Sequence, residues 1–380
     1  MNELHQLIAD LVAIDSVNPD LVLGGAGEAQ IADYIAAWGR ARQLEVAAQT
    51  VAPGRPNVIL RAPGSGGGKS LMLNAHTDTV GVVGMQAPLS PGIRAGRLYG
   101  RGAYDMKSGL AACMLTLLAA RDMGLRGDVI VSAVADEEYG SIGTEALLAE
   151  WARWPADAVV IAEPTALDIS IAHRGFVWLE IETRGKAAHG SLPEQGIDAI
   201  ANMGKILVDL AALDRQLRAE PTHDLLGSGS LHASLIEGGE EISMYPALCK
   251  LLVERRTIPG EDDAHVLAQA QGILDGCAAT DSQFQACVRA TFSRPPYAID
   301  AGHPLVQSLH TVTTARRGRQ PAIVGSSWWT DAALFAAAGV PTVVLGPAGA
   351  GAHAREEWVD LESVARCQAI YTELAAVFCA

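Results

Sequence analysis

The stretch Leu71-Met72-Leu73-Asn74-Ala75-His76-Thr77-Asp78 is a short apolar run that ends at side chains able to bind a metal ion. A second apolar run, Val129 to Ala135, ends in the same way at Asp136-Glu137-Glu138. Such runs indicate buried strands, and in open α/β sheets ligands bind beyond the carboxyl ends of the strands. Because Asp105 lies between these two clusters in the chain, the pattern predicts most of a two-metal hydrolytic site.

Composition indicates a folded protein and argues against two classes of partner. The chain has 380 residues, of which 49% are hydrophobic and 19% charged, so it is long enough for two domains or one large one. Its formal net charge is −15. Binding to a phosphate backbone or to anionic lipid needs a positive surface, so we expect neither a nucleic-acid partner nor a membrane partner.

Cysteine usage and the amino-terminal segment indicate a cytoplasmic protein. The six cysteines include no CxxC pair and form no dense framework, which fits reduced, mostly buried thiols. Residues 2–10 lack a basic segment followed by an apolar core, so we expect no signal peptide. No apolar stretch reaches about 18 uninterrupted residues, and we expect no membrane span.

Apolar strands alternate with helical patterns over the first half of the chain, which predicts an α/β fold. Alternation of this kind is typical of a mainly parallel sheet that is covered on both faces. The predicted helices are 3–14, 27–44, 109–121 and 144–154, and the predicted strands are 57–61, 71–74, 129–135 and 158–161. The glycine-rich segment 63–69 lacks the spacing of a phosphate-binding loop, and we interpret it as a hairpin turn.

The pattern changes near residue 175, where polar and apolar residues begin to alternate. The predicted elements are strands 177–183, 230–236, 248–256 and 285–293, with helices 197–213 and 263–276. Their order, βαββαβ, is that of a ferredoxin-like domain. The first pattern then resumes, with helices 304–316, 331–338 and 360–378 and a strand at 341–345. We therefore expect residues 175–293 to be a domain inserted into a larger one made of residues 1–174 and 294–380.

Five residues of ligand type form a candidate metal site, and four of them follow predicted strands. They are His76, Asp105, Glu138, Glu163 and His353. Zinc accepts imidazole and carboxylate ligands, and five ligands serve two ions if one carboxylate is shared. A lone histidine beside an apolar run is usually structural, and a Glu-Glu pair usually faces solvent. Five such residues in these positions favour a metal site.

The sequence resembles the di-zinc amidohydrolases and carboxypeptidases that include acetylornithine deacetylase, succinyl-diaminopimelate desuccinylase, glutamate carboxypeptidase and aminoacylase. The resemblance spans almost the whole chain, from Ser16-Val17-Asn18-Pro19 to Glu357-Trp358-Val359. Its most specific motifs are His76 to Val80, Gly100 to Gly109, Asp136-Glu137-Glu138, Glu163-Pro164-Thr165 and His353. The fold of this family, a zinc-exopeptidase-like catalytic domain with an inserted lid and dimerisation domain, matches the organisation inferred above.

The resemblance implies a role for each residue of the candidate site. It implies two Zn²⁺ per chain, for which Co²⁺ or Mn²⁺ could substitute. By motif, His76 and Glu163 would bind one ion, Glu138 and His353 the other, and Asp105 both. Asp78 would orient His76, and Glu137 would be the general base.

Two further residues take implied roles from the inserted domain. His189, in Ala187-Ala188-His189-Gly190, matches a histidine that stabilises the oxyanion, in several relatives across a dimer interface, so the resemblance also implies a homodimer formed through the lid. Arg256 matches an arginine that binds the substrate carboxylate, for which a planar guanidinium is suited. The alternatives are a loop histidine beside a turn and a surface salt bridge.

The sequence departs from the family pattern at two places. Relatives often have Asn where this chain has Ser243, in Ser243-Met244-Tyr245-Pro246, which affects one substrate-contacting amide. The segment before Asp331 contains Trp328 and Trp329, which are bulkier than the small residues common there. These tryptophans, Trp329 in particular, either line a substrate pocket or pack in the core.

We expect a hydrolase that cuts an amide bond in a small carboxylate-bearing substrate. Glu163, rather than Asp, resembles the desuccinylase and glutamate carboxypeptidase branches, which favours deacylation of an N-acyl amino acid or release of a carboxy-terminal amino acid, and we expect the first. Release of a carboxy-terminal amino acid by a carboxypeptidase or dipeptidase is the alternative. A non-catalytic binding protein on the same fold is a remote alternative, because such a protein should have lost a ligand or Glu137.

Overall fold

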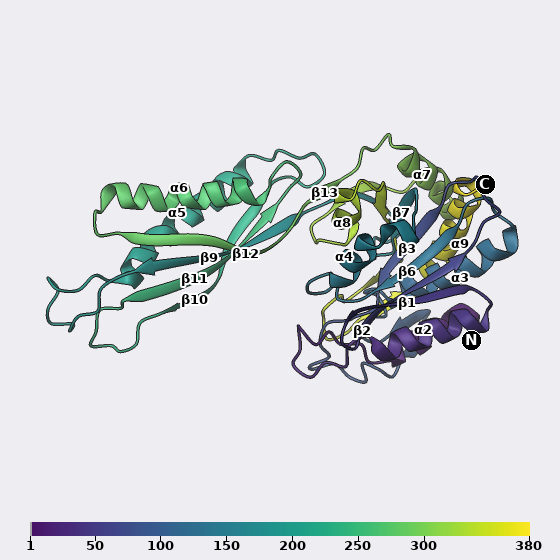
Figure 1. The fold of residues 1–380 in the computed structure, drawn as a ribbon, viewed down its shortest axis with the longest axis horizontal. Coiled ribbons are helices and arrows are strands. Elements are labelled where there is room, and N and C mark those ends of the chain that lie inside the picture. The colour runs from purple at the N-terminus through teal and green to yellow at the C-terminus, as the bar shows by residue number, and fades with distance from the viewer. Residues whose placement is uncertain (1) are drawn as a thin grey trace. The chain divides into compact units, whose positions relative to one another are not determined.

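The computed structural model describes residues 2–380, which fold into two compact units (Figure 1). The first, here called the large unit, comprises residues up to 171 together with 299–324 and 330–380. The second, here called the inserted unit, comprises residues 172–298 and also the short segment 325–329. The α/β fold class predicted from the sequence is confirmed.

A nine-stranded sheet forms the centre of the large unit, although β13 and the last two residues of β8 and β14 fall in the inserted unit. Its strand order is β1-β2-β6-β3-β7-β15-β8-β13, and β14 pairs with β8. Its strands are β1 (Glu45–Ala52), β2 (Arg55–Ala62), β3 (Leu71–His76), β6 (Val129–Val134), β7 (Ala158–Ile161), β8 (Ile169–His173), β13 (Tyr297–Ala298), β14 (Ile323–Ser326) and β15 (Thr342–Val344). Neighbours among β6, β3, β7 and β15 are parallel, whereas the flanking pairs are antiparallel.

Helices bury both faces of this central sheet. Every residue of β3, β6 and β7 is buried, as expected for parallel strands between two helical layers. Alternate residues of β3, Leu71, Leu73 and Ala75, share one core with α1 (Glu3–Ala13), α2 (Ala29–Ala41), α3 (Lys107–Met123), α7 (Pro304–Arg317) and α9 (Leu361–Phe378). The remaining helices of the large unit are α4 (Ile142–Ala149), η1 (Trp151–Arg153) and α8 (Ala332–Ala337). Of these, α4 and α8 contact each other.

The glycine-rich segment 63–69 is not a hairpin turn. It connects β2 to β3, but β6 lies between these two strands in the sheet. The segment instead packs on the backbone that enters β6, because Ser65 N donates to Leu125 O and Gly66 N to Arg126 O. A side chain at Gly64 would lie 2.3 Å from Arg126 O. The glycines therefore permit close packing of two connections, which sequence spacing did not indicate.

A small second sheet in the large unit joins two segments that are far apart in the chain. Its order is β16-β17-β5-β4, formed by β4 (Gly92–Arg94), β5 (Arg97–Tyr99), β16 (Gly349–Ala350) and β17 (Trp358–Asp360). In the pairing of β17 with β5, Trp358 lies opposite Tyr99 and Val359 opposite Leu98. The loops after β5 and before β17 are therefore neighbours.

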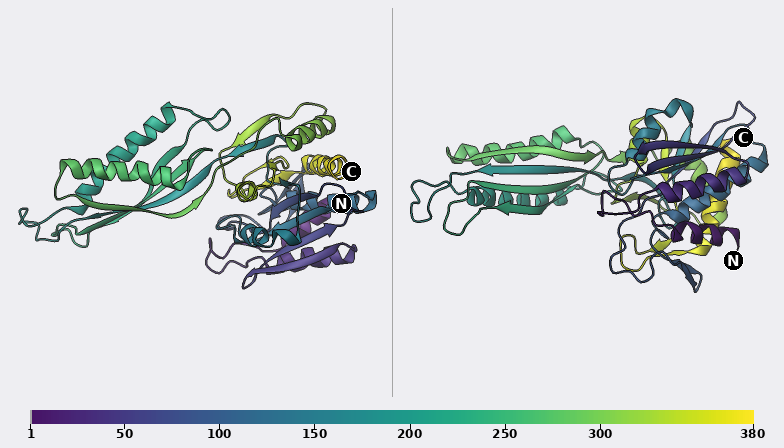
Figure 2. Two further views of the ribbon diagram at one scale, coloured as in Figure 1. Left: turned by 45° about the horizontal axis from the view of Figure 1, so that its top comes forward. Right: turned by 60° about the horizontal axis from the view of Figure 1, so that its bottom comes forward.

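The inserted unit has the predicted βαββαβ order. It consists of β9 (Gly175–Arg184), α5 (Ala199–Ala219), β10 (Ser230–Gly238), β11 (Leu248–Thr257), α6 (Asp263–Thr280) and β12 (Gln285–Arg294). The strands form an antiparallel sheet in the order β10-β11-β9-β12. Figure 2 shows the two helices lying against this sheet. Alternate residues of β9, such as Val177 and Leu179, share a core with both helices.

Candidate metal centre

Three parallel strands bring most of the candidate ligands to one edge of the central sheet. β3 ends at His76, and it lies between β6, which precedes Glu137 and Glu138, and β7, which precedes Glu163. In the register, His76 lies opposite Val134, and Asn74 opposite Ile161. The carboxyl ends of all three strands therefore meet at this edge, as the apolar runs predicted.

The other two candidates, Asp105 and His353, reach the same edge from loops. Asp105 lies two residues before α3, and His353 lies in the loop between β16 and β17. His353 has a φ of 61°, which is uncommon for a residue with a side chain. The structure thus brings together all five residues.

Asp105 lies between two imidazoles, each of which also faces a glutamate. Its Oδ1 atom lies 3.1 Å from His76 Nε2, and its Oδ2 atom lies 3.4 Å from His353 Nε2. His76 Nε2 is 3.5 Å from Glu163 Oε1, and His353 Nε2 is 2.9 Å from Glu138 Oε2. These contacts form two groups of donors that share one carboxylate.

Within the described chain, the carboxylates of the cluster are not neutralised by lysine or arginine side chains, which suits the binding of metal cations. Among residues 2–380, no lysine or arginine forms an ion pair with Asp105, Glu137, Glu138 or Glu163. Burial raises the pKa of Glu163 well above its ordinary value, and burial and the neighbouring Asp105 raise the pKa of Glu138 to about 6. Hydrogen bonds to Asp105 and Glu138 raise the pKa of His353 to about 10. The carboxylates thus attract positive charge, and the donor set fits divalent metal ions.

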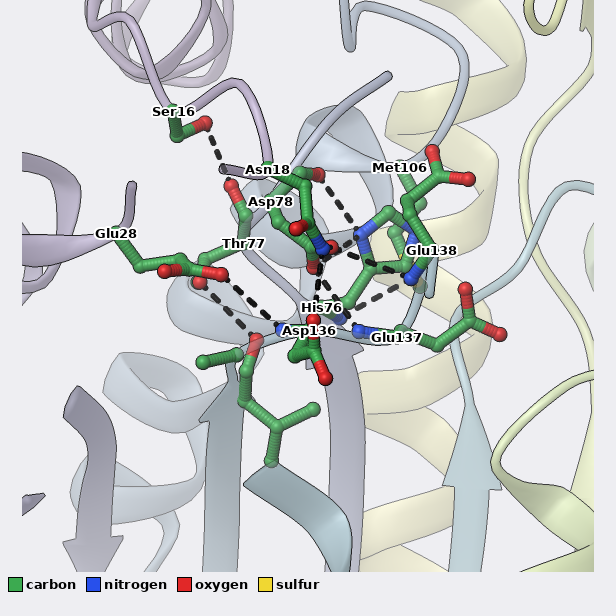
Figure 3. Close-up of polar contacts among 12 residues, drawn as sticks. Ser16, Asn18, Glu28, His76, Thr77, Asp78, Met106, Asp136, Glu137 and Glu138 are labelled. Carbon is green, nitrogen blue, oxygen red and sulfur yellow. Dashed lines mark hydrogen bonds and ion pairs between the residues drawn. The ribbon is translucent and has the colours of Figure 1, made fainter. Parts of the chain in front are cut away.

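Asp78 holds both the His76 ring and the Glu137-Glu138 segment, as Figure 3 shows. Its backbone carbonyl accepts from His76 Nδ1 at 3.0 Å, so Nε2, which faces Asp105 and Glu163, is the ring atom that could bind a metal ion. Its carboxylate accepts from Glu137 N and Glu138 N, each at 3.2 Å. The Asp78 carboxylate lies 3.5 Å from His76 Nδ1.

A buried polar network behind Asp78 was not predicted from the sequence. Asn18 Nδ2 donates to Asp78 Oδ2 at 2.8 Å and to Asp136 Oδ1 at 2.9 Å (Figure 3). Arg55 pairs with Asp136 at 2.9 Å and with Glu28 at 2.6 Å. These partners come from separate parts of the chain, so no local spacing could have revealed them.

Glu137 lies beside His76 and Glu163, whereas His353 contacts Asp105 and Glu138. Donor atoms of Glu137, His76 and Glu163 all lie within 4.8 Å of one another. Burial, with the neighbouring Glu163, raises the pKa of Glu137 well above its ordinary value. Buried Asp331, which accepts from Thr144 Oγ1 at 2.6 Å, adds to this effect and is a further acidic residue that sequence reasoning missed.

His189 and Ser243 lie in adjoining loops of the inserted unit. Gly190 N donates to Ser243 O at 2.7 Å, and His189 forms a bridge with Met244. Ser191 N lies 3.2 Å from His189 Nδ1. An amide nitrogen only donates, so Nδ1 accepts this bond, and Ser191 Oγ lies 2.8 Å from the same ring atom.

Arg256 and Trp329 already have partners within the inserted unit. Arg256 Nε donates to Glu254 Oε1 at 2.6 Å, and its guanidinium lies over the Phe176 ring. Trp329 Nε1 donates to Pro295 O at 3.0 Å. Trp328, by contrast, is 47% exposed and does not pack in a core.

The sequence matches the family model described as Peptidase family M20/M25/M40 over residues 72–377. The chain belongs to this peptidase family. The M20 match includes every candidate ligand, all of β6 and all of β3 except Leu71. The chain is accordingly a hydrolase, and the family resemblance inferred from its motifs is confirmed.

Curated relatives of this M20 protein match it along almost its whole length. It is 28% identical to an acetylornithine deacetylase of Myxococcus xanthus, an alignment that covers 99% of this chain and 97% of the relative. It is 26% identical to an N-formyl-4-amino-5-aminomethyl-2-methylpyrimidine deformylase of Bacillus subtilis, with coverage of 99% and 95%.

Solved structures of the family share the fold of this M20 protein. An M20 family metallo-carboxypeptidase from Sulfolobus solfataricus superposes with a TM-score of 0.81 at 18% identity, covering 100% of this chain and 99% of that one. Aminopeptidase PepT from Bacillus cereus gives a TM-score of 0.78 at 21% identity, covering 98% of each chain. No helix among residues 2–380 has the length and apolar character needed to cross a lipid bilayer.

Proposed function

We propose that this protein removes the acyl group from an N-acyl amino acid by metal-dependent hydrolysis of the amide bond. The observation that carries the proposal is the shared carboxylate, since Asp105 presents one oxygen to His76 and the other to His353. A carboxylate placed in this way suits two metal ions that lie about 3.5–4 Å apart.

The five ligands are assigned to two metal ions, which we propose to be zinc. His76 and Glu163 would hold one ion, Glu138 and His353 the other, and Asp105 both. Co²⁺ and Mn²⁺ also accept this mixture of imidazole and carboxylate donors. When bound, such ions supply Lewis-acid polarisation of the amide carbonyl and acidify the attacking water.

Glu137 is the proposed general base. It lies among the ligands, and its backbone is held by Asp78. Its carboxylate would take a proton from the attacking water and deliver it to the departing nitrogen. The two adjacent glutamates thus take different roles, in which Glu137 moves a proton and Glu138 holds a metal ion.

His189 is the proposed oxyanion donor. The two contacts of His189 Nδ1 with Ser191 leave Nε2 as the ring atom that would donate to a negatively charged oxygen. An imidazole N–H can fill that role without a lysine or arginine side chain beside it. We propose that the inserted domain, residues 175–293, carries this group to the substrate.

Arg256 is the proposed partner of the substrate carboxylate. Its guanidinium forms an ion pair with Glu254 that is partly exposed, so a substrate carboxylate could share or replace this partner. Ser243 and Trp329 are the other proposed substrate contacts. Because the Trp329 indole N–H donates to Pro295 O, this side chain could offer only its ring to the substrate.

Deacylation is favoured over peptide cleavage by the full-length curated relatives. Both named enzymes, a deacetylase and a deformylase, remove an acyl group from nitrogen. The likeness to carboxypeptidase and aminopeptidase structures, at 18% and 21% identity, indicates a shared fold and not a shared substrate. Cleavage of a dipeptide is therefore the second candidate.

A substrate panel distinguishes these two candidates. The zinc-loaded protein would be assayed on N-formyl, N-acetyl and N-succinyl amino acids and on dipeptides, with the chelator-treated protein as control. We expect metal-dependent turnover that is fastest on an N-acyl amino acid. Cleavage of dipeptides with none of the acyl compounds would support a dipeptidase instead, and metal-independent turnover would contradict the proposed site.

We also propose a homodimer formed through the inserted domain, in the cytoplasm. β10 is an edge strand of the inserted sheet, and Leu235 and Ile236 on it are 66% and 53% exposed. An exposed apolar edge strand is suited to pairing with another chain. A monomeric mass in solution would contradict this assignment.

A further inference from the structure

Glu357 is a buried carboxylate outside the proposed ligand set, although it lies four residues after His353. It accepts four hydrogen bonds, all from the segment that ends at Asp105: from Arg101 Nη1 at 2.6 Å, Gly102 N at 3.0 Å, Tyr104 N at 2.8 Å and Asp105 N at 3.0 Å. Successive backbone N–H groups that point at one anion form a concave binding site of known type. One side chain therefore determines how the loop carrying Asp105 folds.

Arg101, the charged partner of Glu357, joins two more loops to this contact. Its Nη2 atom donates to Ala354 O at 2.9 Å, next to His353, and its Nε atom donates to Gly81 O at 3.2 Å. Arg101 is buried, as is Glu357. The Arg101–Glu357 pair thus links the loops that follow or carry His76, Asp105 and His353.

The small sheet places this pair where it cannot shift easily. Trp358, the next residue after Glu357, lies opposite Tyr99 in the pairing of β17 with β5. Gly100 N donates to the backbone carbonyl of Glu357 at 3.1 Å, which extends that pairing. A displacement of Glu357 would therefore also break the register of the small sheet.

Asp105 and His353, the two proposed ligands that the pair reaches, lie in loops that need contacts to hold them in place. Asp105 must present its two oxygens to different imidazoles, and His353 keeps a φ of 61° although it has a side chain and is 58% exposed. Neither residue lies on a strand or helix. Their positions depend on what holds their loops.

We propose that the Arg101–Glu357 pair positions Asp105 relative to His353 and thereby sets how tightly the site retains its metal ions. This inference rests on the ligand assignment of the proposed function. Outer contacts that orient metal ligands typically change metal affinity about 10–100-fold when removed. Both side chains are buried, and they reach the candidate ligands through Asp105 N and through Ala354 O, next to His353.

The chain offers a matched pair of variants for the test. Glu357→Gln replaces two acceptor oxygens that face four N–H donors with one acceptor and one donor, so two contacts become repulsive. Glu356→Gln makes the same change one residue earlier, on an exposed side chain that forms no hydrogen bond or ion pair among residues 2–380. Arg101→Lys keeps the charge but loses the fork that reaches three oxygens.

The readout is retention of cobalt rather than activity. Each variant would be loaded with Co²⁺, and its visible absorption spectrum and the rate of Co²⁺ release to a chelator would be measured. We expect Glu357→Gln to release Co²⁺ at least tenfold faster with an altered spectrum, Arg101→Lys to fall between, and Glu356→Gln to match the wild type. His353→Ala serves as the reference for loss of a ligand.

The outcomes separate this inference from the proposed function. Wild-type release and spectrum in Glu357→Gln, with faster release in His353→Ala, overturn the positioning role and leave the ligand set standing. Wild-type release in both variants overturns the ligand set itself. Should Glu357→Gln fail to fold, Arg101→Lys carries the same test, and an unchanged spectrum and release rate in that variant overturn the inference.

Discussion

Asp105 is the residue that contacts both halves of the candidate site, His76 on one side and His353 on the other. Burial raises the pKa of its carboxyl group, but hydrogen bonds from His353 and His76 outweigh burial and hold the pKa below its ordinary value. The carboxylate is therefore ionised and faces a different imidazole with each oxygen. These properties suit a bridging ligand. Glu137, which lies beside His76 and Glu163, keeps the proposed role of general base.

His189→Ala tests the proposed oxyanion donor at the residue scale. We expect kcat to fall about 10²–10³-fold, which is the usual effect of removing one such donor, while metal content stays at the wild-type level. His189 belongs to the inserted unit, so its loss leaves the candidate ligands intact. Steady-state kinetics and metal analysis check this prediction, and a wild-type kcat would leave His189 as a loop histidine.

The sequence indicates ligands at strand ends more readily than the residues that support them. His76, Glu138 and Glu163 follow apolar runs that form strands β3, β6 and β7, so they could be found from the pattern. Arg55 and Glu28 are joined by an ion pair that links positions 27 residues apart, and no periodicity connects them. Side-chain partners of this kind depend on the tertiary fold.

At the scale of elements, the start of α3 packs tightly against the end of β7. A Cβ atom on Gly109 would lie 2.3 Å from Ala162 O and 3.1 Å from Ala162 Cβ. This contact holds the helix that follows Asp105 against the strand that precedes Glu163. Glycine is required here by close approach, in an element where it is otherwise unfavourable.

Gly109→Ala should therefore destabilise the protein by about 1–3 kcal/mol, the usual cost of overpacking. Gly204→Ala is the control, because Gly204 lies inside α5 and its added Cβ would meet no atom within 4 Å beyond the backbone of its own helix turn. That substitution should stabilise by about 0.4–1 kcal/mol. Denaturant unfolding measures both changes, and an unaltered stability in Gly109→Ala would show that the contact relaxes freely.

Most long elements were predicted, although the eight-residue strand β1 was not. Helices α3 and α9 and strands β6 and β11 lie close to their predicted ranges, because periodicity over many residues is a strong signal. The three-residue strands β4, β5 and β17 went unpredicted, since their pairing links segments far apart in the chain. The pairing around β6 that excludes a hairpin at 63–69 is likewise a property of the whole sheet.

At the scale of the whole molecule, the metal site lies within the large unit, whereas His189, Ser243 and Arg256 lie in the inserted unit. Four acidic side chains gather in the large unit without a lysine or arginine partner among residues 2–380. Bound cations would relieve their mutual repulsion. The stability of the large unit should therefore depend on metal.

Removal of metal should lower the melting temperature by several degrees. A ligand that binds only the native state stabilises it by about 2.7 kcal/mol when its free concentration is a hundred times its Kd. Differential scanning calorimetry of the zinc-loaded and chelator-treated protein checks this expectation. A melting temperature that does not respond to zinc would argue against two tightly bound ions.

The most direct test of the central claim is the turnover of zinc-loaded Glu137→Gln on the best substrate of the panel, with metal content determined on the same sample. Glutamine keeps the shape of the side chain but cannot accept the proton. We predict two metal ions per chain and a loss of turnover of about 10²–10⁴-fold. Turnover at the wild-type rate with both metal ions bound would contradict the account.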